Sequence, residues 1–116
     1  MSPLDVVVKE AGPVTIVAPS GDIDMAVSDD VRARLTSLVD RGRTRLVLDL
    51  GAVINIDSAG LGALVAALKH ARAAGGDIRV CALASDVRAL FEMTRLDKVV
   101  SVHATREEAV AACASS

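Results

Sequence analysis

The chain has 116 residues, a length that fits one domain with its own core. Apolar residues make up 52% of it but aromatic residues only 1%, so we expect an aliphatic core and no aromatic platform for stacking bases or sugars. The net charge of -2, with arginines scattered rather than clustered, excludes an electrostatic case for direct nucleic-acid binding. We expect a single domain over residues 1–116, with an ordered core of roughly residues 4–113.

Nothing in the sequence has the features of a membrane span or a secretory leader. The longest strongly apolar stretch, residues 59–68, is too short to cross a bilayer. Residues 1–5 lack both a basic region and an apolar core. Cys81 and Cys113 form no Cys-x-x-Cys pair, which agrees with a reducing compartment. The sequence therefore predicts a cytoplasmic protein with no membrane partner.

The chain opens with strand-like patterns. β-branched runs over residues 5–10 and 14–18 flank Gly12-Pro13 and predict a β-hairpin. A short extended piece over residues 22–25 follows. Apolar residues then recur at helical spacing, in a helix that we expect Ser28 to cap.

The middle of the chain alternates between strands and helices. Gly42 ends the first helix, and residues 45–50 predict a strand buried on both faces. Residues 55–58 predict a turn, and the helix after it is stopped by Gly75-Gly76.

The same alternation continues to the end of the chain. Residues 78–83 predict a second buried strand, and Ser85 is expected to cap a third helix. A last strand over 99–102 precedes a helix over 106–112, which opens on a capping box at Thr105. Successive βαβ units imply parallel pairing. We therefore predict an α/β fold with one mixed sheet of four or five strands and helices mainly on one face.

Residues 49–62 carry the main functional hypothesis. A buried strand runs into a turn that delivers Ser58 to the start of a helix, near free backbone N–H groups and the positive end of the helix dipole. Such a helix end tolerates a phosphate, which would add roughly -1.5 to -2 charges beside Asp57. Gly60 and Gly62 leave the surroundings of the serine open to another protein. The segment suits a serine whose modification breaks a protein contact.

The same segment also fits a purely structural role. Ser58 or Asp57 can serve simply as a helix N-cap, worth about 1 kcal/mol, and the local pattern alone favours that role. Three catalytic or nucleotide-binding motifs fit less well. A nucleophile elbow needs glycine two residues before the serine, where Ile56 stands. The glycine spacing matches no dinucleotide fingerprint, and no P-loop lysine follows it.

The remaining polar residues give weaker signals. Asp22 and Asp24 alternate in an extended segment, which can suggest metal binding or acid–base chemistry. Without a third ligand, the simpler interpretation is solvated loop acids near Ser58. His70 and His103 have no cysteine at zinc spacing, and nothing supports a Ser-His-Asp triad. We therefore expect no metal, no cofactor and no catalytic residue.

Six pieces of sequence occur in one order along the chain. They are Gly-Asp-Ile-Asp at 21–24, Leu-Asp-Leu at 48–50, Ile-Asp-Ser-Ala-Gly-Leu-Gly at 56–62, Gly-Gly at 75–76, Val-Arg-Ala-Leu-Phe at 87–91 and Thr-Arg-Leu-Asp-Lys at 94–98. In this order they resemble the STAS-domain anti-sigma-factor antagonists of bacteria, over nearly the whole chain. The Asp-Ser-x-Gly-Leu-Gly segment is the most specific part.

The resemblance implies a mechanism and a set of site residues. In this family the unphosphorylated antagonist binds an anti-sigma factor that is also a serine kinase, and so frees the sigma factor. The kinase phosphorylates the antagonist, which then dissociates, and a metal-dependent serine/threonine phosphatase resets it. The family's phosphoserine corresponds to Ser58 and its acidic loop residue to Asp24, while Ala59 stands where many relatives carry Ser or Thr. The partner-binding residues implied are Asp22, Asp24, Asp57, Ser58, Ala59, Gly60, Leu61 and Gly62.

Two further hypotheses stay open at this point. The chain can instead be a STAS accessory subunit of a membrane lipid transporter that is not switched by phosphorylation. Co-purification with transporter ATPase and permease subunits would favour that function. A small hydrolase that uses Ser58 is the third hypothesis, and labelling by a serine-reactive phosphonate would favour it.

Overall fold

A β-hairpin forms one side of the structure, a computed structural model that describes residues 5–115. Strand β1 (Asp5–Ala11) pairs antiparallel with β2 (Val14–Ile23) across Gly12-Pro13, where Gly12 has a φ of 60°. The predicted hairpin is therefore confirmed. Strand β2 is longer than predicted and includes part of the extended piece expected at 22–25. The first residue of the predicted ordered core, residue 4, lies outside the described residues.

The other strands run parallel to β2. Strands β3 (Arg45–Asp49), β5 (Asp77–Cys81) and β6 (Ser101–His103) extend the sheet in the order β1-β2-β3-β5-β6. Strand β4 (Ala52–Ile56) pairs with the last residues of β2, beyond the part that pairs with β3. The mixed α/β sheet is confirmed, and its sixth strand is β4, part of which the sequence had assigned to a turn at 55–58.

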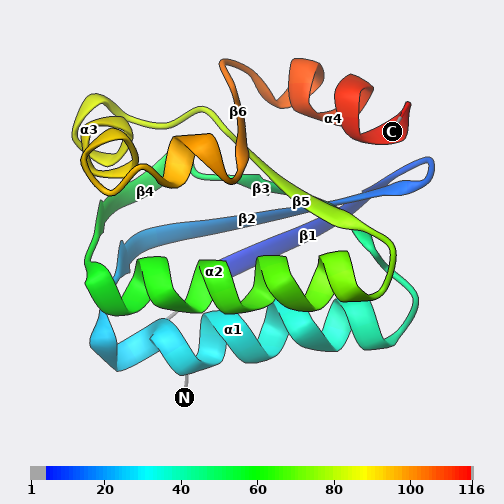
Figure 1. The fold of residues 1–116 in the computed structure, drawn as a ribbon, viewed down its shortest axis with the longest axis horizontal. Coiled ribbons are helices and arrows are strands. Elements are labelled where there is room, and N and C mark those ends of the chain that lie inside the picture. Colours follow the sequence, from blue (N-terminus) through cyan, green and yellow to red (C-terminus); the bar gives the residue numbers. More distant parts are fainter. Residues whose placement is uncertain (1–4, 116) are drawn as a thin grey trace.

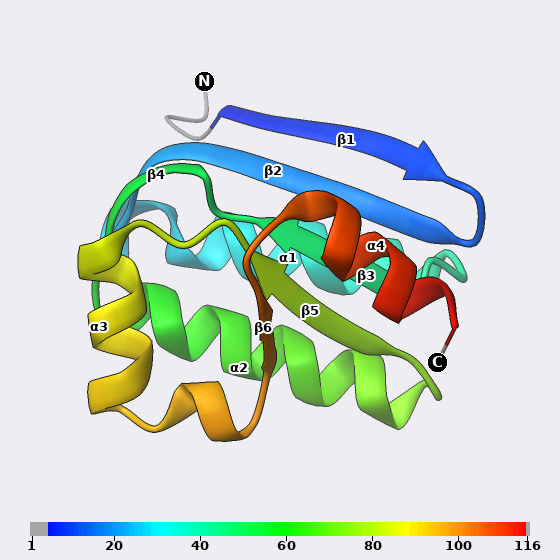
Figure 2. The same cartoon turned by 90° about the horizontal axis from the view of Figure 1, so that it is seen from above.

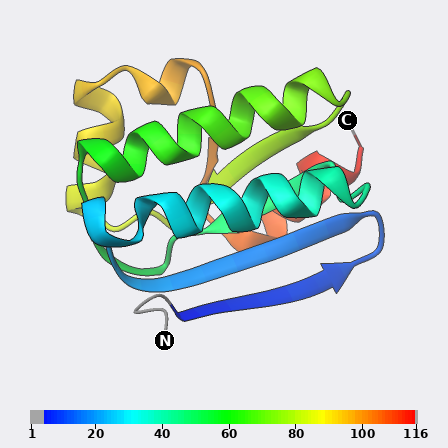
Figure 3. The same cartoon turned by 90° about the horizontal axis from the view of Figure 1, so that it is seen from below.

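Four helices cover the sheet unequally. Helices α1 (Met25–Asp40) and α2 (Ser58–Ala73) lie side by side on one face and run in the same direction (Figures 1 and 3). Helix α3 (Ser85–Met93) and the short 3-10 helix η1 (Leu96–Lys98) close one end. Of the helices within residues 5–115, only α4 (Arg106–Ala114) packs on the opposite face (Figures 1 and 2). The helices therefore lie mainly on one face, as predicted.

Two of the predicted helix caps are wrong. Helix α1 begins at Met25 because Asp24 is its N-cap and accepts from the Ala26 N–H at 3.0 Å. Ser28 lies buried in the first turn, where its hydroxyl donates to the Met25 carbonyl. Helix α3 has Ala84 at its N-cap with no side-chain hydrogen bond. Ser, Thr, Asp and Asn are all good caps, so residue type alone does not choose between Asp24 and Ser28.

The third predicted cap and the aliphatic core are confirmed. Thr105 accepts from the Glu108 N–H at 3.1 Å and so starts α4. The larger core lies under α1, α2 and α3 and consists of Val, Leu, Ile and Ala with Phe91 as its one aromatic residue. A smaller core, which includes Cys81 and Cys113, lies under α4. Among residues 5–115, no helix combines the length and the apolar character that a membrane span requires.

Candidate functional site

Ser58 is exposed at the point where β4 ends and α2 begins. It is the first residue of α2, and the N-cap is Asp57, whose Oδ1 accepts from the Gly60 N–H at 2.9 Å. The sequence left Ser58 and Asp57 as equal candidates for this cap. Within residues 5–115 the Ser58 hydroxyl makes no hydrogen bond. The serine is therefore not needed for capping, and its oxygen is accessible.

The Asp57 carboxylate joins the starts of two helices. Its second oxygen, Oδ2, accepts from the Met25 N–H at 3.1 Å, at the first residue of α1. The Asp57 N–H in turn donates to the Ile23 carbonyl at the end of β2, at 3.2 Å. These bonds hold the N-termini of α1 and α2 next to each other at one end of the molecule (Figure 3). The positive ends of both helix dipoles therefore lie close to Ser58.

The two glycines after Ser58 have different functions. A Cβ on Gly60 would lie 2.5 Å from the Ile23 carbonyl oxygen and 2.8 Å from Cγ1 of Ile56. Only glycine therefore lets α2 approach the end of β2 this closely. A Cβ on Gly62 would meet nothing within 4 Å. The open surface that the sequence predicted around the serine is thus provided by Gly62, whereas Gly60 is buried.

Acidic side chains line one side of this surface. Asp22, Asp24 and Asp57 are all exposed and border a shallow hollow of about 210 Å³. Asp22 accepts from the Asn55 side-chain amide at 3.2 Å. Within the described part of the chain, no three His, Cys, Asp or Glu side chains are placed to hold a metal ion. The structure brings these three predicted site residues together beside Ser58, with a negative charge that a phosphate would increase.

Two exposed apolar side chains, one at the start of α1 and one on β4, were not predicted from the sequence. Met25 is 78% exposed and Ile54, on β4, is 67% exposed. Exposed apolar side chains can contribute to a protein contact when polar groups surround them. Little in the sequence indicated that these side chains are exposed, because residue 25 was expected in an extended piece and residue 54 next to a turn. Leu61, by contrast, is only 7% exposed and packs in the core, so it anchors the first turn of α2 to the rest of the domain.

Neither histidine is bonded to Ser58. His70 lies in the last turn of α2, at the opposite end from Ser58, and its Nε2 is 2.7 Å from Asp40 Oδ1. The His103 ring interacts with Arg79 at 3.2 Å, on the neighbouring strand. Neither His is therefore arranged as a base for the serine.

Comparison with known proteins identifies the class to which this fold and site belong. The STAS domain model matches residues 5–109, so the chain belongs to the STAS domain family. The chain is 35% identical over 97 residues to BtrV of Bordetella bronchiseptica, named as an anti-sigma factor antagonist, and the match covers 84% of both chains. It is 32% identical over 91 residues, 78% of each chain, to the anti-sigma F factor antagonist of Paenibacillus polymyxa.

A solved structure of an anti-sigma factor antagonist has the same fold as this chain. The crystal structure of an anti-sigma factor antagonist from Mycobacterium paratuberculosis matches with a TM-score of 0.84 and 26% sequence identity. The match covers 97% of this chain and 95% of that one. The family that the sequence resembles is therefore confirmed.

Proposed function

We propose that this protein is an anti-sigma factor antagonist, which acts by binding and not by catalysis. The relatives named above carry that function in their names, and the match to them spans most of both chains. The observation that carries the proposal is Ser58 itself, an exposed serine at the first residue of α2 whose hydroxyl makes no hydrogen bond to any of residues 5–115.

The partner-binding surface is the end of the molecule around Ser58. It consists of the exposed acids, the serine, the open backbone and the two exposed apolar side chains: Asp22, Asp24, Asp57, Ser58, Ala59, Gly62, Met25 and Ile54. Apolar side chains surrounded by polar ones are the usual composition of a protein interface. Gly60 and Leu61, which the family resemblance also implied, support this surface from within because both are buried.

Phosphorylation of Ser58 switches the binding off. The phosphate adds roughly -1.5 to -2 charges and three acceptor oxygens. The N-terminus of α2 stabilises an anion there, so the folded domain tolerates the modification. The three neighbouring carboxylates make the surface strongly negative once the phosphate is present. A partner that fits the neutral serine must then bury the phosphate's charge in the contact without a matching group, which opposes binding.

The partners of the protein are the two enzymes that add and remove the phosphate on Ser58. The kinase is the anti-sigma factor, and a serine/threonine phosphatase removes the phosphate. No described histidine is bonded to Ser58, which agrees with a serine that is a substrate of another protein's active site. Both enzymes act in the cytoplasm, where sigma factors work.

Phosphorylation mapping tests the proposal directly. The purified protein is incubated with ATP and an anti-sigma serine kinase from the same organism, and the products are analysed by mass spectrometry. We expect one phosphate, on Ser58, and none on the Ser58→Ala variant. Ser85→Ala is the matched control, because Ser85 is also an exposed first residue of a helix. A phosphate that persists in Ser58→Ala and disappears in Ser85→Ala would refute the assignment.

A further inference from the structure

Strand β1 is an edge of the sheet that no other element among residues 5–115 covers (Figures 2 and 3). It is seven residues long and contains no proline. Val7 is 54% exposed and Val8 is 47% exposed, although they lie on opposite faces of the strand. The unpaired N–H and C=O groups of such an edge are a template for pairing with another strand. This edge is separate from the Ser58 surface and has no part in the function proposed above.

The hairpin register shows which backbone groups of β1 are free. Ala11 pairs with Val14 across a two-residue turn, so these two residues exchange backbone hydrogen bonds. Hydrogen-bonded pairs alternate along an antiparallel ladder. Asp5, Val7 and Lys9 therefore bond to β2, as Ala11 does, and the intervening residues 6, 8 and 10 direct their N–H and C=O groups outward.

We propose that this free edge pairs with β1 of a second copy, antiparallel and centred on Val7. Val7 then lies opposite Val7 of the second copy, and Val6 opposite Val8. The Val6–Val8 pairs are the hydrogen-bonded ones, because these residues have the outward backbone groups. The two sheets join into one continuous sheet, related by a two-fold axis through the Val7 pair.

Charge selects this register among those that the ladder permits. With Val7 at the centre, Asp5 of each copy lies opposite Lys9 of the other, which gives two complementary pairs. Centring on Val6 or Val8 places no Asp opposite a Lys. Centring on Lys9 places the two lysines together. A lysine on an edge strand usually hinders pairing, but here Asp5 neutralises it in one register only.

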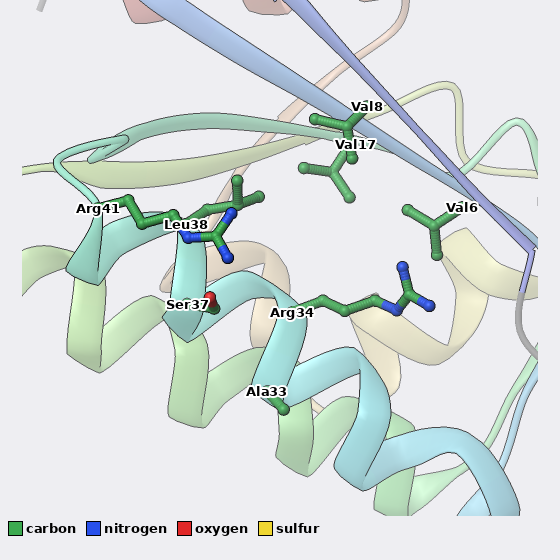
Figure 4. A pocket seen from close by; sticks show the side chains of 8 residues that line it. All are labelled: Val6, Val8, Val17, Ala33, Arg34, Ser37, Leu38 and Arg41. Atoms are coloured by element: carbon green, nitrogen blue, oxygen red, sulfur yellow. The ribbon is translucent and has the colours of Figure 1, made fainter. Parts of the chain in front are cut away.

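The side chains on the face of β1 that points toward α1 add apolar area to the contact between the two copies. Val6 and Val8 border a groove of about 470 Å³ between β1 and α1, walled by Leu38 and by the stems of Arg34 and Arg41 (Figure 4). Pairing brings the grooves of the two copies side by side above four valines. A contact of one strand from each copy is smaller than a standard interface, so we expect a weak dimer, in the micromolar to millimolar range.

Disulfide trapping tests the register. In a directly opposed non-hydrogen-bonded pair the Cβ atoms are about 4.5–5.5 Å apart, close to disulfide distance. We expect Val7→Cys to form a covalent dimer on mild oxidation at least about tenfold faster than Lys9→Cys, whose two thiols would be about 13 Å apart. The native Cys81 and Cys113 are buried and do not interfere. Equal rates for the two variants would overturn the proposal.

Charge exchange provides an independent test with the unlinked protein. Sedimentation equilibrium up to about 1 mM should show a dimer that Asp5→Lys weakens at least about fivefold, since both cross-strand pairs become repulsive. Lys9→Asp should weaken it similarly, and the double variant Asp5→Lys/Lys9→Asp should restore it. A monomer at all concentrations, or a double variant as weak as the single ones, would contradict the pairing.

Discussion

Gly60 sets the distance between the start of α2 and the end of β2. The two atoms nearest to a Cβ at this position are 2.5 and 2.8 Å away, and the nearer one is a backbone oxygen that cannot rotate aside. We expect Gly60→Ala to lower the free energy of unfolding in urea by about 2–4 kcal/mol. Gly62→Ala is the matched control and should raise it by up to about 1 kcal/mol, because that position is open and helical. Equal effects of the two substitutions would refute the close approach.

The Cys81 thiol predicts a loss of stability at alkaline pH. Burial, together with the nearby Asp49 carboxylate, raises its pKa to about 11. In the unfolded chain the thiol ionises near pH 8.5. Between these values the unfolded state binds fewer protons than the folded state, so the free energy of unfolding falls as pH rises from about 9 to 11, by up to about 3 kcal/mol.

The Cys81 prediction is measured by urea unfolding at pH 8, 9.5 and 11. The chain has no tyrosine, so no phenol titrates in this window. We expect Cys81→Ala to be less stable at pH 8 but to lose less stability between pH 8 and 11 than the wild type. The pKa of Cys113 is also raised by burial, so part of the slope should persist. Parallel curves for the two proteins would contradict the prediction.

At the scale of elements, one carboxylate fixes the relative position of α1 and α2 at the site. Asp57 accepts from an N–H of each helix, whereas Asp24 accepts from α1 only. We expect Asp57→Ala to lower the free energy of unfolding by about 2 kcal/mol and Asp24→Ala by about 1 kcal/mol, measured by chemical denaturation. If Asp57→Ala cost no more than Asp24→Ala, the bridge between the helices would contribute nothing.

Helix α3 is anchored by the only phenylalanine of the chain. Phe91 is fully buried in the larger core, whereas Met93, two residues later, is 80% exposed. We expect Phe91→Ala to lower the free energy of unfolding by about 3–5 kcal/mol. Met93→Ala should change it by less than about 0.5 kcal/mol. Thermal unfolding monitored by circular dichroism would show the difference, and similar melting temperatures for both variants would contradict it.

Elements with a strong local pattern were predictable from the sequence. The hairpin, the buried strands and the start of α4 each have their turn, apolar run or capping box within a few residues. Strand β4 could not be predicted in this way, because it is short, mostly exposed and paired only with the far end of β2. Its partner strand is adjacent in space and not in sequence.

At the scale of the whole molecule, the sequence proposed the candidate site residues but could not predict how their side chains are bonded. The sequence identified Ser58 and its acidic neighbours through a collinear resemblance. It could not show that Asp57 bonds to Met25, 32 residues away, because that contact depends on the packing of two helices. Asp57 takes the capping role, and the Ser58 hydroxyl is left without a hydrogen bond in the described part of the chain.

A phosphate on Ser58 is expected to end the binding of an anti-sigma factor. The most direct test is the calorimetric affinity of the unmodified and the Ser58-phosphorylated protein for the anti-sigma kinase of the same organism, in ADP. We expect phosphorylation to weaken binding at least about a hundredfold, and Ser58→Ala to bind like the unmodified protein. Equal affinities for the phosphorylated and unmodified proteins would show that Ser58 phosphorylation does not control the binding.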